Sequence, residues 1–292
     1  PIAAHKAGWA AQAPNLWWQY LCDATKKLLT ETQLKADQIS SIGISYQMHG
    51  LVLVDRDLNP LRKSIIWCDS RATPYGEKAF EKLGKDYCKD HLLNSPGNFT
   101  ASKLAWVIEN EPELYQSVYK FMLQGDFLAA KLTGLTQTTI TGLTEGVFWD
   151  FKNDTPSKAL LDHYQIDQSL VPEVVTNFTV QATISKTGAS ATGLLEGTPI
   201  TYRSGDQPNN AYTLGARCSG DIVATGGTSG VVYALTDQLS GAELTKVNTF
   251  AHVDYQPEQK MFGKLLNLNG AGIQYLSLIH ISEPTRLRRI AD

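Results

Sequence analysis

A single carboxylate stands where an apolar strand is expected to run into a glycine turn. The segment TYRSGDQPNN (201–210) places Asp206 directly after Gly205. A second small-residue turn, ATGGTSG (224–230), offers backbone amides without bulky side chains. An acid that accepts a proton and bare amides that bind anionic oxygens are what phosphoryl transfer requires. Both turns are also compatible with ordinary surface loops, because Gly, Asp, Asn and Ser favour turns for conformational reasons.

Two further segments carry side chains that suit a polyol. Met48 and His49 lie between two predicted strands in SYQMHG. The stretch WCDSR combines an apolar wall in Trp67 with a hydroxyl acceptor in Asp69. Each has a structural alternative: a lone histidine at a strand end is commonly a satisfied turn residue, and Asp69 can simply pair with Arg71.

Spacing excludes two other kinds of site. The nucleophile elbow G-x-S-x-G does not fit the GGTSG run, because Val231 stands where its last glycine is needed. The cysteines are scattered without C-x-x-C pairs, so neither a zinc site nor a disulfide framework is indicated. Reduced thiols of a cytosolic protein are the expected state.

Length and charge narrow the class of partner. The 292 residues, 42% hydrophobic, are enough for two domains or one large one. A formal net charge of -3 provides no basic surface for nucleic acid or an anionic membrane. No apolar run approaches the ~18 residues of a membrane span, and the opening residues lack a signal-peptide layout. A small soluble substrate and a cytoplasmic location are therefore expected.

Hydrophobic periodicity predicts the elements that must position these groups. Apolar side chains recur at three- and four-residue spacing over 14–31, which predicts a helix whose stripe covers a core. That stripe consists of Trp17, Tyr20, Leu21, Ala24 and Leu28. Strands of a mixed sheet are predicted at 42–46, 51–55 and 64–67, and helices at 73–86, 101–110 and 126–133, the last ending at Gly134. The threonine-rich stretch 136–144 is expected to form strand and loop, and 157–200 short helices and loops.

The second half is predicted to be rich in strands. A strand over 199–202 precedes Asp206, and a short helix follows at 209–217. A hairpin is expected from 221–225 and 230–235, with further strands at 248–253 and 261–268 and a turn at 269–272. A second domain is expected to begin near residue 218.

Both ends of the chain look abnormal. No strand precedes the first predicted helix, so an edge of the sheet is expected to be absent. The closing stretch SLIHISEPTRLRRIAD shifts abruptly to a basic composition with Arg286, Arg288 and Arg289 close together. Residues 277–292 are therefore predicted to be a non-native tail outside the fold.

Five segments resemble, in order and separation, those of the FGGY carbohydrate kinases, and within them most nearly the xylulokinases. They are SYQMHG (45–50), IIWCDSRA (65–72), NFTASKLAWVIENEP (98–112), GDQPNNA (205–211) and ATGGTSGVVYAL (224–235). The likeness covers about residues 1–276. It implies an α/β fold of two actin-like, ribonuclease-H-like domains, with mixed sheets flanked by helices and with sugar and ATP bound in the cleft between them.

The chain departs from the family pattern at both ends. Residues 1–217 correspond to the N-terminal sugar-binding domain without its first β-hairpin, which in the family contacts the ATP phosphates. Residues 218–276 correspond to the start of a C-terminal nucleotide-binding domain, which is expected to be truncated. Lys103 and Trp106, although they resemble the family closely, are expected to pack rather than to perform chemistry.

The resemblance also implies roles for individual residues. Asp206 would be the general base. The expected sugar contacts are Gln47, Met48, His49, Trp67, Asp69 and Gln207. The expected ATP contacts are Gly226, Gly227, Thr228, Ser229, Gly270 and Gly272. No protein ligand for a metal is expected, because Mg²⁺ would be held mainly by phosphate oxygens and water.

The implied activity is transfer of the γ-phosphoryl group of Mg-ATP to a ketopentose, D-xylulose first, to give D-xylulose 5-phosphate. One alternative is a sugar-binding fragment without catalysis. Another is a kinase of the same family that acts on ribulose, gluconate or glycerol. The sugar and ATP are the expected partners, nucleic acid and membranes are not, and a homodimer is left open.

Overall fold

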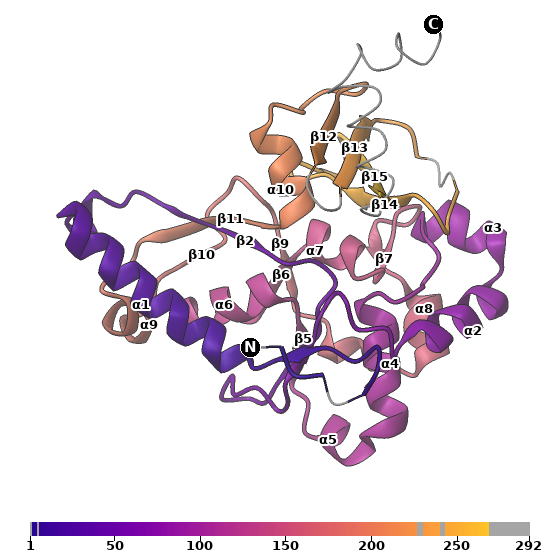
Figure 1. The fold of residues 1–292 in the computed structure, drawn as a ribbon, viewed down its shortest axis with the longest axis horizontal. Coiled ribbons are helices and arrows are strands. Elements are labelled where there is room, and N and C mark those ends of the chain that lie inside the picture. Colours follow the sequence, from indigo (N-terminus) through magenta and orange to yellow (C-terminus); the bar gives the residue numbers. More distant parts are fainter. Residues whose placement is uncertain (1, 5, 227–229, 240–242, 269–292) are drawn as a thin grey trace, which may run out of the picture.

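The computed structural model describes residues 2–4, 6–226, 230–239 and 243–268, and the fold is mixed α/β (Figure 1). The helices are α1 (Pro14–Thr32), α2 (Thr73–Leu83), α3 (Lys85–Tyr87), α4 (Thr100–Asn110), α5 (Pro112–Gln116), α6 (Gln124–Thr133), α7 (Ile140–Glu145), α8 (Lys158–Tyr164), α9 (Lys186–Thr192) and α10 (Asp206–Thr213). None of these described helices is long and apolar enough to span a bilayer.

The strands form several small sheets. They are β1 (Ala11–Gln12), β2 (Ile42–Tyr46), β3 (Val52–Val54), β4 (Ser64–Ile65), β5 (Lys120–Met122), β6 (Gln137–Thr139), β7 (Trp149–Asp150), β8 (Thr155–Pro156), β9 (Glu173–Val175), β10 (Ala182–Thr183), β11 (Pro199–Gly205), β12 (Ile222–Gly226), β13 (Gly230–Thr236), β14 (Asn248–Ala251) and β15 (Phe262–Leu268). The mixed α/β class is confirmed, as are the hairpin β12–β13 and the two strands that follow it. The placement of 42–46, 51–55 and 64–67 in one mixed sheet is wrong, because β2, β3 and β4 belong to three different sheets.

The parallel pair of β2 and β11 positions the polar segments singled out from the sequence. Tyr46, the last residue of β2, is the register partner of Gly205, the last residue of β11. Because parallel strands end at the same edge of a sheet, residues 47–49 and 206–207 leave the sheet side by side. β10 pairs with the other edge of β11 and runs antiparallel to it.

Helix α1 forms over the predicted range, but the predicted apolar stripe is only partly right: Trp17 and Leu21 pack against the core, and the other three residues are exposed. Tyr20 and Leu28 are 58% and 54% exposed. The side that packs against α6 and α9 includes Trp18 and Leu21. The sequence contains adjacent tryptophans at 17 and 18, so a 3.6-residue repeat fits either starting point, and only the neighbouring helices decide between them.

Two other local expectations are corrected. Instead of a strand and loop over 136–144, the short strand β6 leads into helix α7. Thr139 starts that helix, because its side-chain oxygen accepts a hydrogen bond from Gly142 N and satisfies one of the free donors of the first turn. Helix α10 begins at Asp206 rather than at residue 209, which places the acid in the first helical turn.

The sheet ordered β12-β13-β15-β14 is attached to the rest of the protein along β14 (Figure 1). Asn94, fully buried, binds both backbone groups of Thr249: its Nδ2 donates to the carbonyl at 2.6 Å and its Oδ1 accepts from the amide at 2.8 Å. Ala251 N, at the end of β14, donates to Thr144 Oγ1, and the carbonyl of Val253, two residues past the strand, accepts from Asn177 Nδ2. Side chains of the first part therefore replace a neighbouring strand at this edge.

Apolar packing strengthens the same attachment. Four side chains that follow the sheet's first hairpin belong to the core cluster of the N-terminal part; they are Leu244, Ala251, Tyr255 and Phe262. The expected domain boundary near residue 218 falls in the link between α10 and β12.

Replacing Asn94 by Ala should lower the free energy of unfolding by about 2 kcal/mol, since two buried backbone groups of Thr249 lose their partner. Urea denaturation of Asn94→Ala beside Asn15→Ala, a change at an exposed position of α1, measures this. Equal stability of the two variants would contradict the assigned role of Asn94.

Candidate active site

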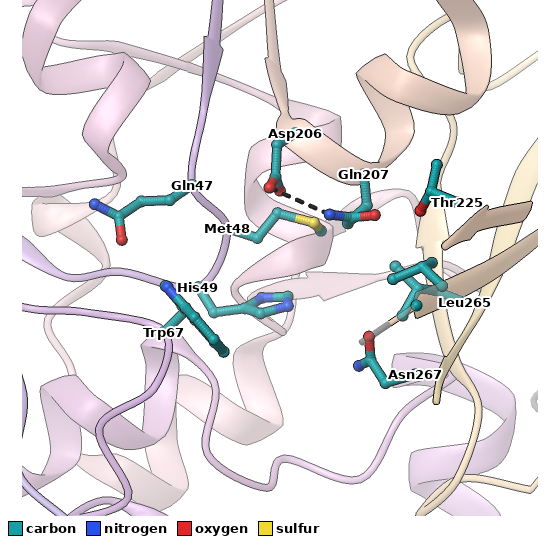
Figure 2. A pocket seen from close by; sticks show the side chains of 11 residues that line it. Gln47, Met48, His49, Trp67, Asp206, Gln207, Thr225, Leu265 and Asn267 are labelled. Atoms are coloured by element: carbon teal, nitrogen blue, oxygen red, sulfur yellow. Dashed lines mark hydrogen bonds between the residues drawn. The ribbon is translucent and has the colours of Figure 1, made fainter. Parts of the chain in front are cut away.

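A cavity of about 450 Å³ lies between the ends of β2 and β11 on one side and the β12–β15 sheet on the other (Figure 2). Its lining consists of Gln47, Met48, His49, Trp67, Asp206, Gln207, Thr225, Gly230, Val231, Leu265 and Asn267. The structure thus brings together most of the side chains that the sequence singled out as sugar contacts and the expected general base. The volume falls in the usual range for small-molecule sites.

Gly205 sets how closely the two strand ends approach. Its backbone φ of -57° is ordinary, so the glycine is not needed for the sharp turn expected from the sequence. A Cβ at this position would instead collide with Glu145 Oε2 and with Met48 Cγ. The residue before Asp206 must therefore be small because of close packing.

Asp206 occupies the first turn of α10 and faces the cavity (Figure 2). Gln207 Nε2 donates to Asp206 Oδ2 at 3.2 Å. Partial burial raises the pKa of Asp206, and the hydrogen bonds from Gln207 oppose that rise only in part. A carboxylate with a raised pKa binds a proton more strongly, which suits a general base.

His49 is held in one protonation state. Its Nδ1 lies 2.9 Å from the backbone carbonyl of Glu145, and a carbonyl can only accept. Burial, assisted by the nearby positive charge of Lys103, lowers the pKa of His49 to about 3. The ring is therefore neutral at pH 7 with its proton on Nδ1, and Nε2 is left as an acceptor for a ligand hydroxyl.

Trp67 contributes an exposed aromatic face to the cavity, with 60% of its surface accessible. Asp69, in contrast, is not among the lining residues. Its carboxylate is fully buried and accepts hydrogen bonds from the Arg71 side chain at 2.7 to 3.0 Å and from Ala10 N. The pairing with Arg71 that the sequence left open is the arrangement seen, and it fixes the loop that carries Trp67.

The opposite wall comes from the sheet of the second part. Gly226 ends β12, and a Cβ built there would meet no atom of the described residues within 4 Å, so no described side chain blocks a ligand from approaching its backbone. Gly227, Thr228, Ser229, Gly270 and Gly272 lie outside the described residues. Among the described residues, no group of three or more His, Cys, Asp or Glu could hold a metal ion.

Two groups of residues at the site were not predicted as functional from the sequence. Thr225 and Asn267 line the cavity from separate strands of the second part; Thr225 lies within the ATGGTSG segment but was not singled out, and Asn267 lies in no motif. Glu145 and Lys103 contact His49 from behind the cavity. Glu145 directly follows the threonine-rich stretch 136–144, and its burial becomes apparent only once α7 is known to be a helix.

Comparison with known proteins shows the family of the chain. Residues 1–212 match the N-terminal domain of the FGGY family of carbohydrate kinases. A curated relative, xylulose kinase of Bacillus subtilis, is 31% identical over 257 residues, which are 86% of this chain and 50% of the relative. The chain thus spans about half the length of the curated relatives it matches.

Solved structures share the fold. Xylulose kinase from Rhodospirillum rubrum superposes with a TM-score of 0.84 at 19% identity, covering 100% of this chain and 59% of that one. Glycerol kinase of Plasmodium falciparum with ADP superposes with a TM-score of 0.83 at 18% identity, covering 99% and 60%. At such identities the likeness establishes the sugar-kinase fold, which confirms the expected fold class.

Gly205→Ala should destabilise the protein by about 1–3 kcal/mol, the usual cost of forcing an atom into a packed site, because the new methyl group meets Glu145 and Met48. Gly226→Ala is the matched control, since its added methyl meets open space. Thermal and urea denaturation compare the two. If both substitutions proved equally mild, the close approach at Gly205 would not be essential.

The raised pKa of Asp206 predicts a pH-dependent stability difference. A carboxyl whose pKa is higher in the folded state costs stability once the pH exceeds its unfolded pKa of about 3.9. Asp206→Asn removes that cost, so the variant should be more stable than wild type near pH 7, and the difference should vanish as the pH falls towards 4. Urea denaturation across this range checks it, with exposed Asp23→Asn as control. A variant less stable than wild type at pH 7 would contradict the burial argument.

Proposed function

Because the chain belongs to the FGGY family of carbohydrate kinases, we propose that it forms the sugar-binding part of an ATP-dependent kinase whose acceptor is a ketopentose, D-xylulose first. The observation that carries the proposal is the cavity in which Asp206, His49 and Trp67 converge. The curated relatives named xylulose kinase support D-xylulose as the first sugar to test.

Asp206 is proposed to act as the general base. Its carboxylate takes the proton of the sugar's terminal hydroxyl as the oxygen forms a bond to the γ-phosphorus and the bond from that phosphorus to the bridging oxygen breaks. ADP leaves with the electron pair of the broken bond. The raised pKa of Asp206 favours this transfer, because burial makes the carboxylate a better proton acceptor.

The remaining cavity residues would hold the sugar. His49 Nε2 accepts a hydrogen bond from one hydroxyl, and the amides of Gln47 and Gln207 can donate and accept others. Trp67 supplies an apolar face for the carbon chain. Holding the acceptor oxygen near Asp206 supplies much of the rate, because phosphoryl transfer depends chiefly on positioning and charge stabilisation.

The nucleotide would approach from the β12–β13 side. Gly226 follows the lining residue Thr225 in β12, and it and the glycine, threonine and serine that come next in the sequence are proposed phosphate contacts. When bound, ATP supplies the phosphoryl group, and Mg²⁺ would be held by its phosphate oxygens and water. Asn267 and Thr225, which the structure adds to the lining, are polar groups on this same wall.

Direct measurements distinguish two alternatives from the proposed D-xylulose kinase. A fragment that only binds sugar would take up D-xylulose in calorimetric titration without ATP affinity or ADP release. A kinase for ribulose, gluconate or glycerol would differ in a coupled ADP-release screen over a panel of sugars, because the polyols differ by one or two hydrogen bonds. That screen is necessary because a glycerol kinase superposes on the chain about as well as a xylulose kinase does, so the fold does not distinguish their substrates.

Asp206→Asn should reduce D-xylulose phosphorylation by ~10² or more in a version extended to the length of its relatives, the usual scale for loss of a general base. Titration calorimetry should show that the same variant still binds the sugar. Asp23→Asn, on the exposed side of α1, should leave both measurements unchanged. Turnover retained by Asp206→Asn would remove Asp206 from the role of base.

A further inference from the structure

His49 has a backbone conformation that is uncommon for residues other than glycine. Its φ is +60°, in the left-handed region that residues with a Cβ adopt uncommonly and at a cost in conformational energy. The same residue contributes its ring to the cavity. Something must therefore compensate the unfavourable backbone of a residue that faces the ligand.

Two buried ionisable residues bind His49 on three sides. Lys103 Nζ donates to the His49 carbonyl at 2.6 Å. Glu145 accepts twice, through its backbone carbonyl from the ring Nδ1 at 2.9 Å and through its Oε1 from the His49 amide at 3.4 Å. Lys103 is 0% exposed and Glu145 1% exposed, so both contacts are shielded from water.

We propose that Lys103 and Glu145 are positioning residues: they hold His49 in its left-handed conformation and in the Nδ1–H tautomer, so that Nε2 accepts a hydrogen bond from a substrate hydroxyl. The inference rests on the proposed function, because it specifies how the sugar pocket is kept in shape. It also assigns chemistry to Lys103, which sequence reasoning regarded as packing.

The burial of these two residues argues against a role in packing alone. Burial lowers the pKa of Lys103 to about 7 and raises that of Glu145 well above its usual value, so both side chains are held at a cost in solvation. Apolar side chains of similar size would avoid that cost. Each polar head instead ends on a backbone group of His49.

Glu145 also connects His49 to the general base. Its Oε2 packs against Gly205, the residue before Asp206, while its Oε1 faces the His49 amide. One carboxyl group therefore touches the ends of both β2 and β11. A side chain that is not part of the cavity lining therefore helps to set the distance between the hydroxyl acceptor and the base.

The tautomer has a consequence for specificity. With Nδ1 bound to a carbonyl, Nε2 can only accept, so the ligand group beside it must be a donor. A hydroxyl meets this requirement. A ligand that carries an ether or carbonyl oxygen at that position would face a second acceptor and bind poorly.

The first test needs no variant of the supporting residues. Long-range ¹H–¹⁵N correlation NMR of the chain, with the His49 ring assigned by its disappearance in His49→Gln, reports the tautomer and titration. We expect a neutral Nδ1–H ring that does not titrate between pH 7.5 and about 5. An Nε2–H ring, or a titration near the usual histidine pKa, overturns the proposal whether or not sugar binds.

The second test uses Lys103→Met and Lys120→Met, two lysines whose ammonium groups donate to backbone carbonyls, the latter remote from the cavity. Lys103→Met should weaken D-xylulose binding about 10-fold or more in titration calorimetry and populate the second His49 tautomer. Lys120→Met should do neither. Wild-type affinity and tautomer in Lys103→Met overturn the role of Lys103.

Glu145 is tested by a conservative and a disruptive change. Glu145→Gln keeps an oxygen for the His49 amide and should retain binding within about 3-fold, whereas Glu145→Leu should lose about 10-fold or more. Equal binding by Leu and Gln variants overturns the positioning role. If wild type shows the expected His49 signature but binds no sugar, the proposed function fails while the positioning of His49 stands supported.

Discussion

The parallel registration of β2 with β11 is the constraint on which the site depends. It ends both strands at the same edge, with Tyr46 opposite Gly205, so that His49 and Asp206 emerge within reach of one ligand. The absence of a side chain at Gly205 lets Glu145 and Met48 close against the backbone there. A shift of one residue in this pairing would turn alternate side chains to the other face and separate the two groups.

A second constraint brings the opposite wall into place. The β12–β15 sheet has no strand partner at its β14 edge within the described chain, yet the alternate backbone groups of that edge are bound by Asn94, Thr144 and Asn177. Side-chain hydrogen bonds of this kind specify both the orientation and the register of the sheet. The cavity, which needs walls from both parts, depends on that attachment.

Burial of ionisable groups recurs around the cavity, with a different result at each position. Asp206 becomes a stronger base, His49 a neutral acceptor, and Lys103 and Glu145 lose part of their preference for the charged form. The common cause is the free-energy cost of removing a charged group from water, which shifts each pKa towards the neutral form. Hydrogen bonds determine how large that shift is at each residue. Chemistry and positioning thus draw on the same physical effect.

The sequence by itself determined the family, most element positions and the segments that form the site, because ordered motifs and apolar periodicity are local properties. It also located Asp206 after a strand. It could not choose the buried side of α1, since adjacent tryptophans fit two phases of the same repeat, and it missed α7, since an N-cap at Thr139 outweighed the β-propensity of a threonine-rich run.

Only the tertiary structure decided which candidates share a cavity. It directed Asp69 to Arg71 and away from the cavity lining, added Asn267 and Thr225 to the opposite wall, and placed Glu145 and Lys103 on His49. Apart from the local pairing of Asp69 with Arg71, these outcomes depend on residues that are far apart in the sequence, such as His49 with Lys103 and with Glu145. Strand register and side-chain packing decide such contacts, and neither is encoded in the spacing of a motif.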